Sequence, residues 1–164
     1  MSDPFAEFNA ALSLARTPQE PFEALHRLTL ATVGARLFTL TTVEEAGRLA
    51  RRSYTSNPAA YALSGTKVVE PSRWNTIVLE QRQCFVANSL AEIAEVFPDH
   101  ALIGSLGLGS VVNMPVILRG EVGTTLNLLD VAGYYTDARV AFIIQNLTLP
   151  TMAAQLAHDA LRRD

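Results

Sequence analysis

Two asparagines, Asn113 and Asn127, stand inside runs of apolar and β-branched residues, with Thr125 close to the second. An asparagine in an apolar strand must find hydrogen-bond partners if it is buried, because an unpaired amide in the interior costs free energy. The partners can be backbone groups, water or a bound small molecule. The pattern therefore fits a ligand-binding pair as well as a pair that is satisfied within the protein.

Residues for covalent or metal chemistry are sparse. Cys84 is the only cysteine, so it forms no internal disulfide and no cysteine cluster for zinc or redox chemistry. It begins a short apolar run, which favours a packing role. The histidines, His26, His100 and His158, are too scattered to suggest a nucleophile with its base. We predict no catalytic residue and no metal site, although an Asp or Glu pair stays open, and an enzyme is the less favoured interpretation.

Length and composition indicate one compact domain. The chain has 164 residues, of which 49% are hydrophobic and 18% charged, so residues 1–164 are expected to form a single domain. A net charge of -3 gives no reason to expect nucleic acid or an anionic membrane as partner. The first residues lack the blocks of a signal peptide, and no run approaches the roughly 20 apolar residues of a membrane span. We expect a cytoplasmic protein.

Residues 108–130 are predicted to form the central β-hairpin, with Arg119 and Gly120 in the turn. Both surfaces of this hairpin are mostly apolar, so it should lie inside an antiparallel sheet covered on both sides. Pro115 cannot donate to the ladder and needs a bulge, a strand end or an unpaired side. A two-residue turn predicts a register with these pairs: Leu118 and Glu121, Ile117 and Val122, Val116 and Gly123, Pro115 and Thr124, Met114 and Thr125, Asn113 and Leu126, Val112 and Asn127.

The remaining elements follow from periodicity and capping residues. The second helix starts either at a capping box of Thr17 and Glu20 or a few residues later at Pro21, and ends at Gly34. Three arginines on the strand over 48–55 favour a solvated edge over an anion site. The other expected elements are helices over 5–15, 72–81 and 90–97, strands over 35–43 and 84–87, an irregular stretch over 56–71, a flexible lead-in over 99–109, and a long C-terminal helix bent near Pro150.

Four stretches follow one another in this order of elements: RSYTSNPAAYALSGTK, CFVANSLAEIAEVFPDH, SLGLGSVVNMPVILRGEVGTTLNLLD and GYYTDARV. Together they resemble a GAF domain, the small-molecule-sensing relative of the PAS domain, and the resemblance covers roughly residues 20–157. It implies an α+β fold with a central antiparallel sheet of five or six strands. It further implies that the terminal helices pack on one face and that residues 56–106 roof a pocket on the other.

This placement suggests seven ligand-binding candidates. Simpler structural roles remain open for three of them. Asn88 fits a turn or cap, His100 a solvated or backbone-bonded loop position, and Trp74 a core position beside Ile77 and Val78. The candidates are Tyr61 and Trp74 as aromatic walls, and Asn88, His100, Asn113, Thr125 and Asn127 as hydrogen-bonding groups.

The resemblance narrows the ligand without identifying it. The signature of cyclic-nucleotide-binding GAF domains cannot be placed here, and no cysteine matches the bilin attachment site, so both ligands are disfavoured. A single cysteine cannot complete the cycle of the methionine sulfoxide reductase branch, whereas a haem on His100 stays open. We expect a stand-alone sensory module that binds a small molecule and forms a homodimer through its terminal helices. The alternative is a non-catalytic dimeric interaction module whose pocket is filled by Trp74 and Phe85.

Overall fold

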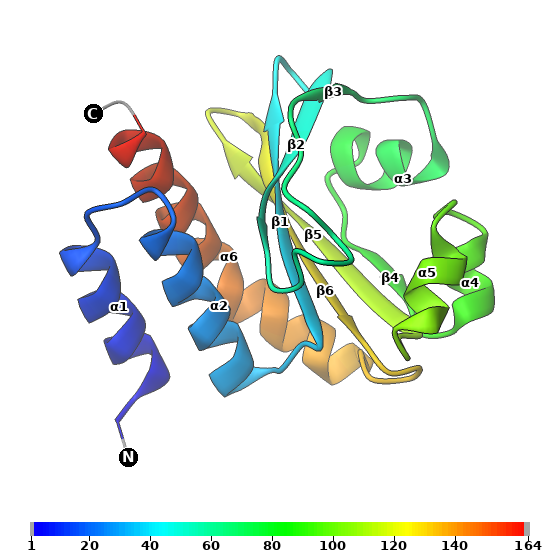
Figure 1. Cartoon of the computed structure of the whole chain (residues 1–164), viewed down its shortest axis with the longest axis horizontal. Helices are drawn as coiled ribbons and strands as arrows, with labels where there is room; N and C mark the ends of the chain where they lie inside the picture. Colours follow the sequence, from blue (N-terminus) through cyan, green and yellow to red (C-terminus); the bar gives the residue numbers. More distant parts are fainter. Residues whose placement is uncertain (1, 163–164) are drawn as a thin grey trace.

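The fold is built on one six-stranded antiparallel sheet with helices on both faces (Figure 1). A computed structural model describes residues 2–162. The strand order is β3-β2-β1-β6-β5-β4, so the β5–β6 hairpin lies inside the sheet, as predicted. The predicted α+β class is confirmed. The strands are β1 Leu37–Glu44, β2 Leu49–Thr55, β3 Lys67–Val68, β4 Phe85–Ala87, β5 Ser110–Leu118 and β6 Glu121–Asp130.

Three helices lie on one side of the sheet, namely α1 Pro4–Leu14, α2 Glu20–Thr32 and α6 Asp137–Leu161. Helices α2 and α6 cover the face of the sheet, whereas α1 packs against α2 (Figure 1). Of the two starts left open for α2, the structure has the later one, with Pro21 in the first turn. The Glu20 carboxylate still accepts the backbone N–H of Thr17 at 3.1 Å. Gly34 follows the helix with φ +85°, a left-handed conformation that glycine adopts without strain.

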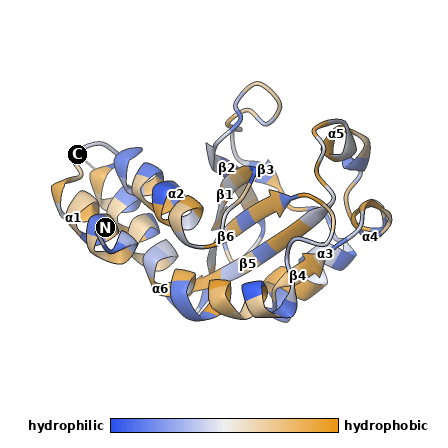
Figure 2. Ribbon diagram, turned by 90° about the horizontal axis from the view of Figure 1, so that it is seen from below, coloured by the Kyte–Doolittle hydropathy of each residue, from blue (hydrophilic) through white to orange (hydrophobic). Residues whose placement is uncertain are grey.

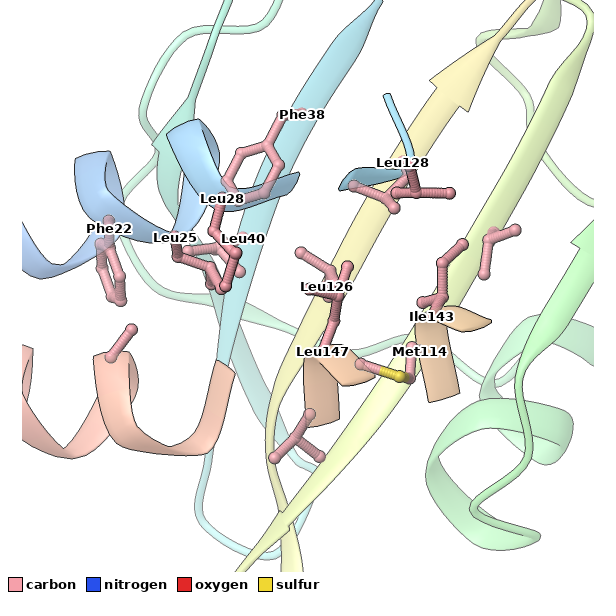
Figure 3. Close-up of a cluster of buried hydrophobic side chains, with 14 of the residues drawn as sticks. Phe22, Leu25, Leu28, Phe38, Leu40, Met114, Leu126, Leu128, Ile143 and Leu147 are labelled. Atoms are coloured by element: carbon pink, nitrogen blue, oxygen red, sulfur yellow. The ribbon is translucent and has the colours of Figure 1, made fainter. Parts of the chain in front are cut away.

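The larger core lies between these helices and the sheet (Figure 3). It is made by alternate residues of the central strands, because successive side chains in a strand point to opposite faces. On β6, for example, Leu126 and Leu128 point toward the helices and are fully buried. They meet Leu25 of α2 and Leu147 of α6, which are buried as completely. This face is therefore packed by the domain's own helices.

The second face is covered by shorter elements and by the irregular stretch before them. These elements are α3 Arg73–Asn75, the π-helical turn η1 Thr76–Glu80, α4 Leu90–Ala94 and α5 His100–Ser105. Ser72 caps α3, and Ser89 with Glu92 forms the predicted capping box of α4. A second hydrophobic cluster, centred on Val78 and Ile93, joins this roof to the sheet. The expectation that residues 56–106 form a roof over the second face of the sheet is thereby confirmed.

The predicted register of the hairpin is wrong beyond Ile117. The first two pairs hold, but Val116 lies opposite Thr124 and not opposite Gly123. A bulge at this point leaves Gly123 as an extra residue on β6 and shifts every later pair by one. As a result Asn113 lies directly opposite Asn127, on the same face of the sheet. The predicted register had placed these two side chains on opposite faces.

Pro115 sits where β5 has a partner strand on one side only. Strand β4 begins opposite Asn113 and runs away from Pro115, so it does not pair with the proline. Pro115 itself pairs with Thr125 of β6. The missing N–H is therefore tolerated at an unpaired side, one of the solutions that the sequence required.

The expected flexible lead-in over 99–109 is wrong in part, because His100–Ser105 forms helix α5. Its three glycines argued against a helix on propensity. Packing explains the result, since Ile103 is buried and Gly104 lies under Leu90 of α4. A Cβ on Gly104 would approach the Leu90 side chain to 2.9 Å. The glycine thus permits close contact between the two short helices.

Within the described residues, α6 is the one helix whose length and composition would allow it to span a membrane. Its inward face is occupied by the domain core, with Ile143 and Ala154 fully buried. The helix continues through Pro150. In Figure 2 it alternates between hydrophobic and hydrophilic residues, whereas β5 and β6 are mostly hydrophobic. This pattern is that of a helix packed on a sheet.

Because of the bulge, we predict that replacing Gly123 with a larger residue destabilises the fold. A Cβ at Gly123 would lie 2.8 Å from Cβ of Leu118, a contact that requires the backbone to shift. We expect Gly123→Ala to lower the free energy of unfolding by roughly 1–3 kcal/mol, as overpacking does. Gly65→Ala is the matched control, because no atom lies within 4 Å of its added Cβ. Urea unfolding of both variants checks this, and equal midpoints would contradict the bulge.

Candidate functional site

The site begins with the buried pair on β5 and β6. Asn113 donates from Nδ2 to Oδ1 of Asn127 at 2.8 Å, and both side chains are buried. The pair exists because the bulge at Gly123 brings the two residues opposite each other. Cross-strand neighbours lie close enough for such a contact. Each amide therefore satisfies one hydrogen-bonding group of the other within the apolar sheet.

The hydrogen-bond network extends from this pair to β1 and to the roof. Asn127 donates from Nδ2 to Oγ1 of Thr39 at 3.2 Å and of Thr41 at 3.1 Å. Trp74 donates from Nε1 to Oδ1 of Asn113 at 3.0 Å. Within the described residues, neither threonine hydroxyl donates to an acceptor, and Asn113 has one N–H to spare. The network is thus internally connected but retains donors for a further group.

A cavity of about 220 Å³ lies beside this network, between the sheet and the roof. The two asparagines and the two threonines form its polar side. The remaining wall is largely hydrophobic, which is typical of small-molecule sites. Its apolar lining consists of Leu37, Trp74, Phe97, Ile103, Val111 and Leu129.

Two oppositely charged residues also face the cavity, on either side of Tyr61. Tyr61 donates its hydroxyl to Oδ2 of Asp99 at 2.7 Å, and the Arg52 guanidinium lies 5.0 Å from the centre of its ring. Arg52 also donates to the carbonyl of Ala62 at 2.9 Å. Burial first, and then the hydrogen bond to Asp99, raise the pKa of Tyr61 above its ordinary value. The phenol therefore remains a donor at neutral pH.

The structure brings together four of the seven predicted ligand-binding residues, namely Tyr61, Trp74, Asn113 and Asn127. Thr125 shares their face of the sheet and is fully buried, but it does not line the cavity. Its Oγ1 has no hydrogen-bond partner in the part of the chain that the structure describes. A buried hydroxyl without a partner is uncommon, so a bound group or water has reason to approach this part of the sheet.

Asn88 and His100 lie away from the cavity lining. Asn88 binds the backbone of Tyr135 twice, donating from Nδ2 to its carbonyl at 2.8 Å and accepting its N–H at 3.1 Å. His100 contacts the carbonyl of Phe97 through Nδ1 at 3.0 Å. Both side chains are thus engaged in holding loops, which are the simpler roles that the sequence left open.

Sequence reasoning missed the four other polar or charged lining residues, Arg52, Asp99, Thr39 and Thr41. Arg52 had been assigned to a solvated edge strand. It lies opposite Thr41 in the ladder, so both side chains share the cavity face. The alternation of Thr39 and Thr41 with Phe38 and Leu40 was a usable signal, because it places the two threonines on the face opposite the helix-side core.

Two larger hollows, of about 500 and 530 Å³, lie near the turn of the β5–β6 hairpin. Both are lined by mixed charges, such as Glu45, Arg119 and Arg162 in one, and Arg48 and Glu80 in the other. The second is bordered by the roof residues Asn75 and Glu80, but neither hollow is lined by Asn113 or Asn127. The smaller cavity is therefore the better candidate for a specific ligand.

Residues 2–162 contain no group of three or more His, Cys, Asp or Glu side chains that could hold a metal ion. Burial raises the pKa of the Cys84 thiol to about 11. A thiol of that pKa is almost entirely protonated at neutral pH and is a poor nucleophile. The arrangement suits noncovalent recognition of a small molecule.

The asparagine network predicts non-additive mutations. Asn127→Leu removes the acceptor of the N–H that Asn113 donates to Asn127, and Asn113→Leu removes the acceptor of Nε1 of Trp74, so each should lower the free energy of unfolding by roughly 1–3 kcal/mol. The double variant should lose less than the sum, because it removes both amides together. Urea unfolding of the four proteins in a double-mutant cycle measures this coupling. Strictly additive losses would show that the two amides do not depend on each other.

No protein-family model matches the sequence, and no curated protein does. Solved structures match it closely in fold. The chain is similar to the GAF domain of an Acinetobacter phosphoenolpyruvate-protein phosphotransferase, with a TM-score of 0.71, 9% identity, and coverage of 98% of each chain.

Two further structures agree. The chain is similar to a GAF domain/HD domain protein from Geobacter sulfurreducens, with a TM-score of 0.65, 17% identity, and coverage of 93% of this chain and 99% of that one. It is also similar to the GAF domain of a two-component sensor histidine kinase from Bacillus halodurans, with a TM-score of 0.66, 16% identity, and coverage of 87% and 98%. This chain has the fold of a GAF domain.

Proposed function

We propose that this protein is a sensory or regulatory module that binds a small organic molecule in the cavity beside Asn113 and Asn127. One observation carries the proposal. A connected, buried polar network borders a largely apolar cavity and still has donors to offer. Such a combination of an apolar wall with few oriented polar groups is how small-molecule sites obtain affinity and specificity.

The size of the cavity limits the ligand. At about 220 Å³ it is smaller than the roughly 300–1,000 Å³ of pockets that hold drug-sized ligands. A compact metabolite fits this volume better than a nucleotide, a bilin or a haem. We therefore expect a ligand with an apolar body and a small number of polar atoms.

The cavity is bordered by parts of the roof that are distant in sequence. Tyr61 lies in the irregular stretch, Trp74 lies in α3, and Asp99 is the residue immediately before α5. A ligand that contacts all three favours the arrangement in which they lie close together, and so shifts the population of roof conformations. In this proposal that shift is the signal. A cytoplasmic location belongs to the same proposal.

One observation favours the second candidate, a non-catalytic interaction module with a self-filled pocket. Trp74 already occupies the acceptor of Asn113, as a plug would. Phe85, the other residue expected to fill the pocket, packs instead against Phe97 in the roof core and does not line the cavity. Under this alternative the cavity is a packing void and no ligand orders the roof.

Native mass spectrometry separates the two candidates. We expect the purified protein to carry excess mass that disappears on denaturation. The double variant Asn113→Leu with Asn127→Leu should lose that mass while keeping its far-ultraviolet circular dichroism, because it removes the polar side of the cavity. A wild-type protein without excess mass, or a double variant that retains it, would favour the self-filled interaction module.

We further propose a homodimer formed through the terminal helices. Leu149 and Leu156 of α6 are 70% and 45% exposed and lie one heptad apart, so they share one helix face. Leu30 of α2 is also half exposed. Exposed leucines gathered on one helix layer are typical of an interface with a second copy.

The dimer can be tested by reversing the character of that face. We expect Leu149→Glu with Leu156→Glu to convert a dimer into a monomer, because two buried carboxylates would oppose association. Light scattering after size exclusion measures the mass. Leu63→Glu is the control, since Leu63 is similarly exposed but lies in the roof. A wild-type monomer, or a double variant that remains dimeric, would contradict this interface.

A further inference from the structure

We propose that the ligand of this cavity is a free α-amino acid with an apolar side chain. This inference rests on the proposed function, because it requires the cavity beside Asn113 and Asn127 to be a binding site. What carries it is the pair of opposite charges, Arg52 and Asp99, that face the cavity on either side of Tyr61.

Arg52 supplies the positive charge. It is half-buried, it faces the cavity across from Thr41, and within the described residues no carboxylate lies within salt-bridge distance of it. Within the described residues its guanidinium makes one hydrogen bond, from Nη1 to the carbonyl of Ala62. The other guanidinium N–H groups are available, and a guanidinium presents them in a fork that matches a carboxylate. The Thr41 hydroxyl lies beside this position as an additional donor.

Asp99 supplies the negative charge. Its Oδ2 accepts the Tyr61 hydroxyl, whereas Oδ1 has no partner within the described residues. The carboxylate thus keeps a lone-pair side for a cation. Because the Tyr61 hydroxyl remains protonated, the two residues stay bonded and Asp99 is held in place at the cavity wall.

The apolar part of the cavity wall limits the chemistry of a ligand that lies beside Arg52 and Asp99. The apolar residues Leu37, Ile103 and Leu129 offer no hydrogen-bonding group to a polar side chain. A simple organic acid would satisfy Arg52 but bring its charge near Asp99, and a simple amine would do the reverse. A zwitterion places one charge against each residue. With an apolar side chain against the leucines and Ile103, it also suits the small volume.

The test is a series in which one charge of the ligand is deleted at a time. The probes are L-leucine with isocaproate and isoamylamine, and L-phenylalanine with hydrocinnamate and phenethylamine. Each acid lacks only the ammonium group, and each amine lacks only the carboxylate. Trp74 is the sole tryptophan of the 164 residues and lines the cavity, so its fluorescence reports occupancy. We expect at least one amino acid to bind roughly tenfold or more tightly than both of its analogues.

Two conservative variants assign the charges. Arg52→Gln should weaken amino-acid binding and remove the preference over the amine. Asp99→Asn should remove the preference over the acid, and it keeps an acceptor for Tyr61. Arg48→Gln is the control, because Arg48 is an exposed arginine next to β2 that does not line this cavity.

The outcomes separate this inference from the proposed function. If an acid or an amine binds as tightly as its amino acid, the cavity is a binding site but the amino-acid assignment is wrong. Absence of any response to all six probes at millimolar concentration would also overturn the assignment, while excess mass in the native spectrum would still support a pocket. Equal effects of Arg52→Gln and Arg48→Gln would show that Arg52 does not read the ligand.

Discussion

Two buried asparagine amides in the middle of an apolar sheet are the constraint on which the rest of the structure depends. A buried amide without partners costs free energy comparable to several good contacts, so Asn113 and Asn127 must meet each other and their neighbours. They do so only because the bulge at Gly123 shifts the register of the hairpin. The network then extends to Thr39 and Thr41 on one side and to Trp74 on the other, and so fixes how the roof sits over the sheet.

The two faces of the sheet serve different purposes. The helix face is filled by complementary side chains such as Leu25, Leu126 and Leu147, and it gives the domain its stability. The opposite face has short helices, irregular backbone and a cavity. Fewer buried apolar contacts and more loop make that face easier to rearrange. A rigid layer behind a more adaptable one is a suitable arrangement for a ligand-responsive module.

Much of the fold could be predicted, because it depends on local signals. Residues close in sequence are enough to predict helix α1, the Arg119-Gly120 turn and the capping box of Ser89 with Glu92. The two covered faces were predicted as well, and so was the order of elements apart from β3, which lies in the stretch expected to be irregular, and α5. What local signals did not reveal was the bulge, since Gly123 is needed there only when Leu118 packs over it. Helix α5 was missed for a similar reason, because its stability comes from burial of Ile103.

The candidate site was predicted only in part. Asparagines within apolar strands are conspicuous in any sequence, and Tyr61 and Trp74 are aromatic residues in the segment that forms the roof. Arg52 was not recognised, because an arginine on a strand is usually solvated, and only the pairing with Thr41 shows that it faces the cavity. Asp99 was missed because its contact with Tyr61 joins segments 38 residues apart. Charges of this kind become informative once the fold brings them together.

The most direct measurement for the asparagine network is the hydrogen-exchange rate of the single indole N–H, which belongs to Trp74. The account predicts slow exchange in the wild-type protein, because Nε1 donates to the buried Oδ1 of Asn113, and much faster exchange in Asn113→Leu. Fast exchange in the wild-type protein, or a rate unchanged by that substitution, would mean that the roof is not tied to the asparagine pair, and the basis of the proposed site would be lost.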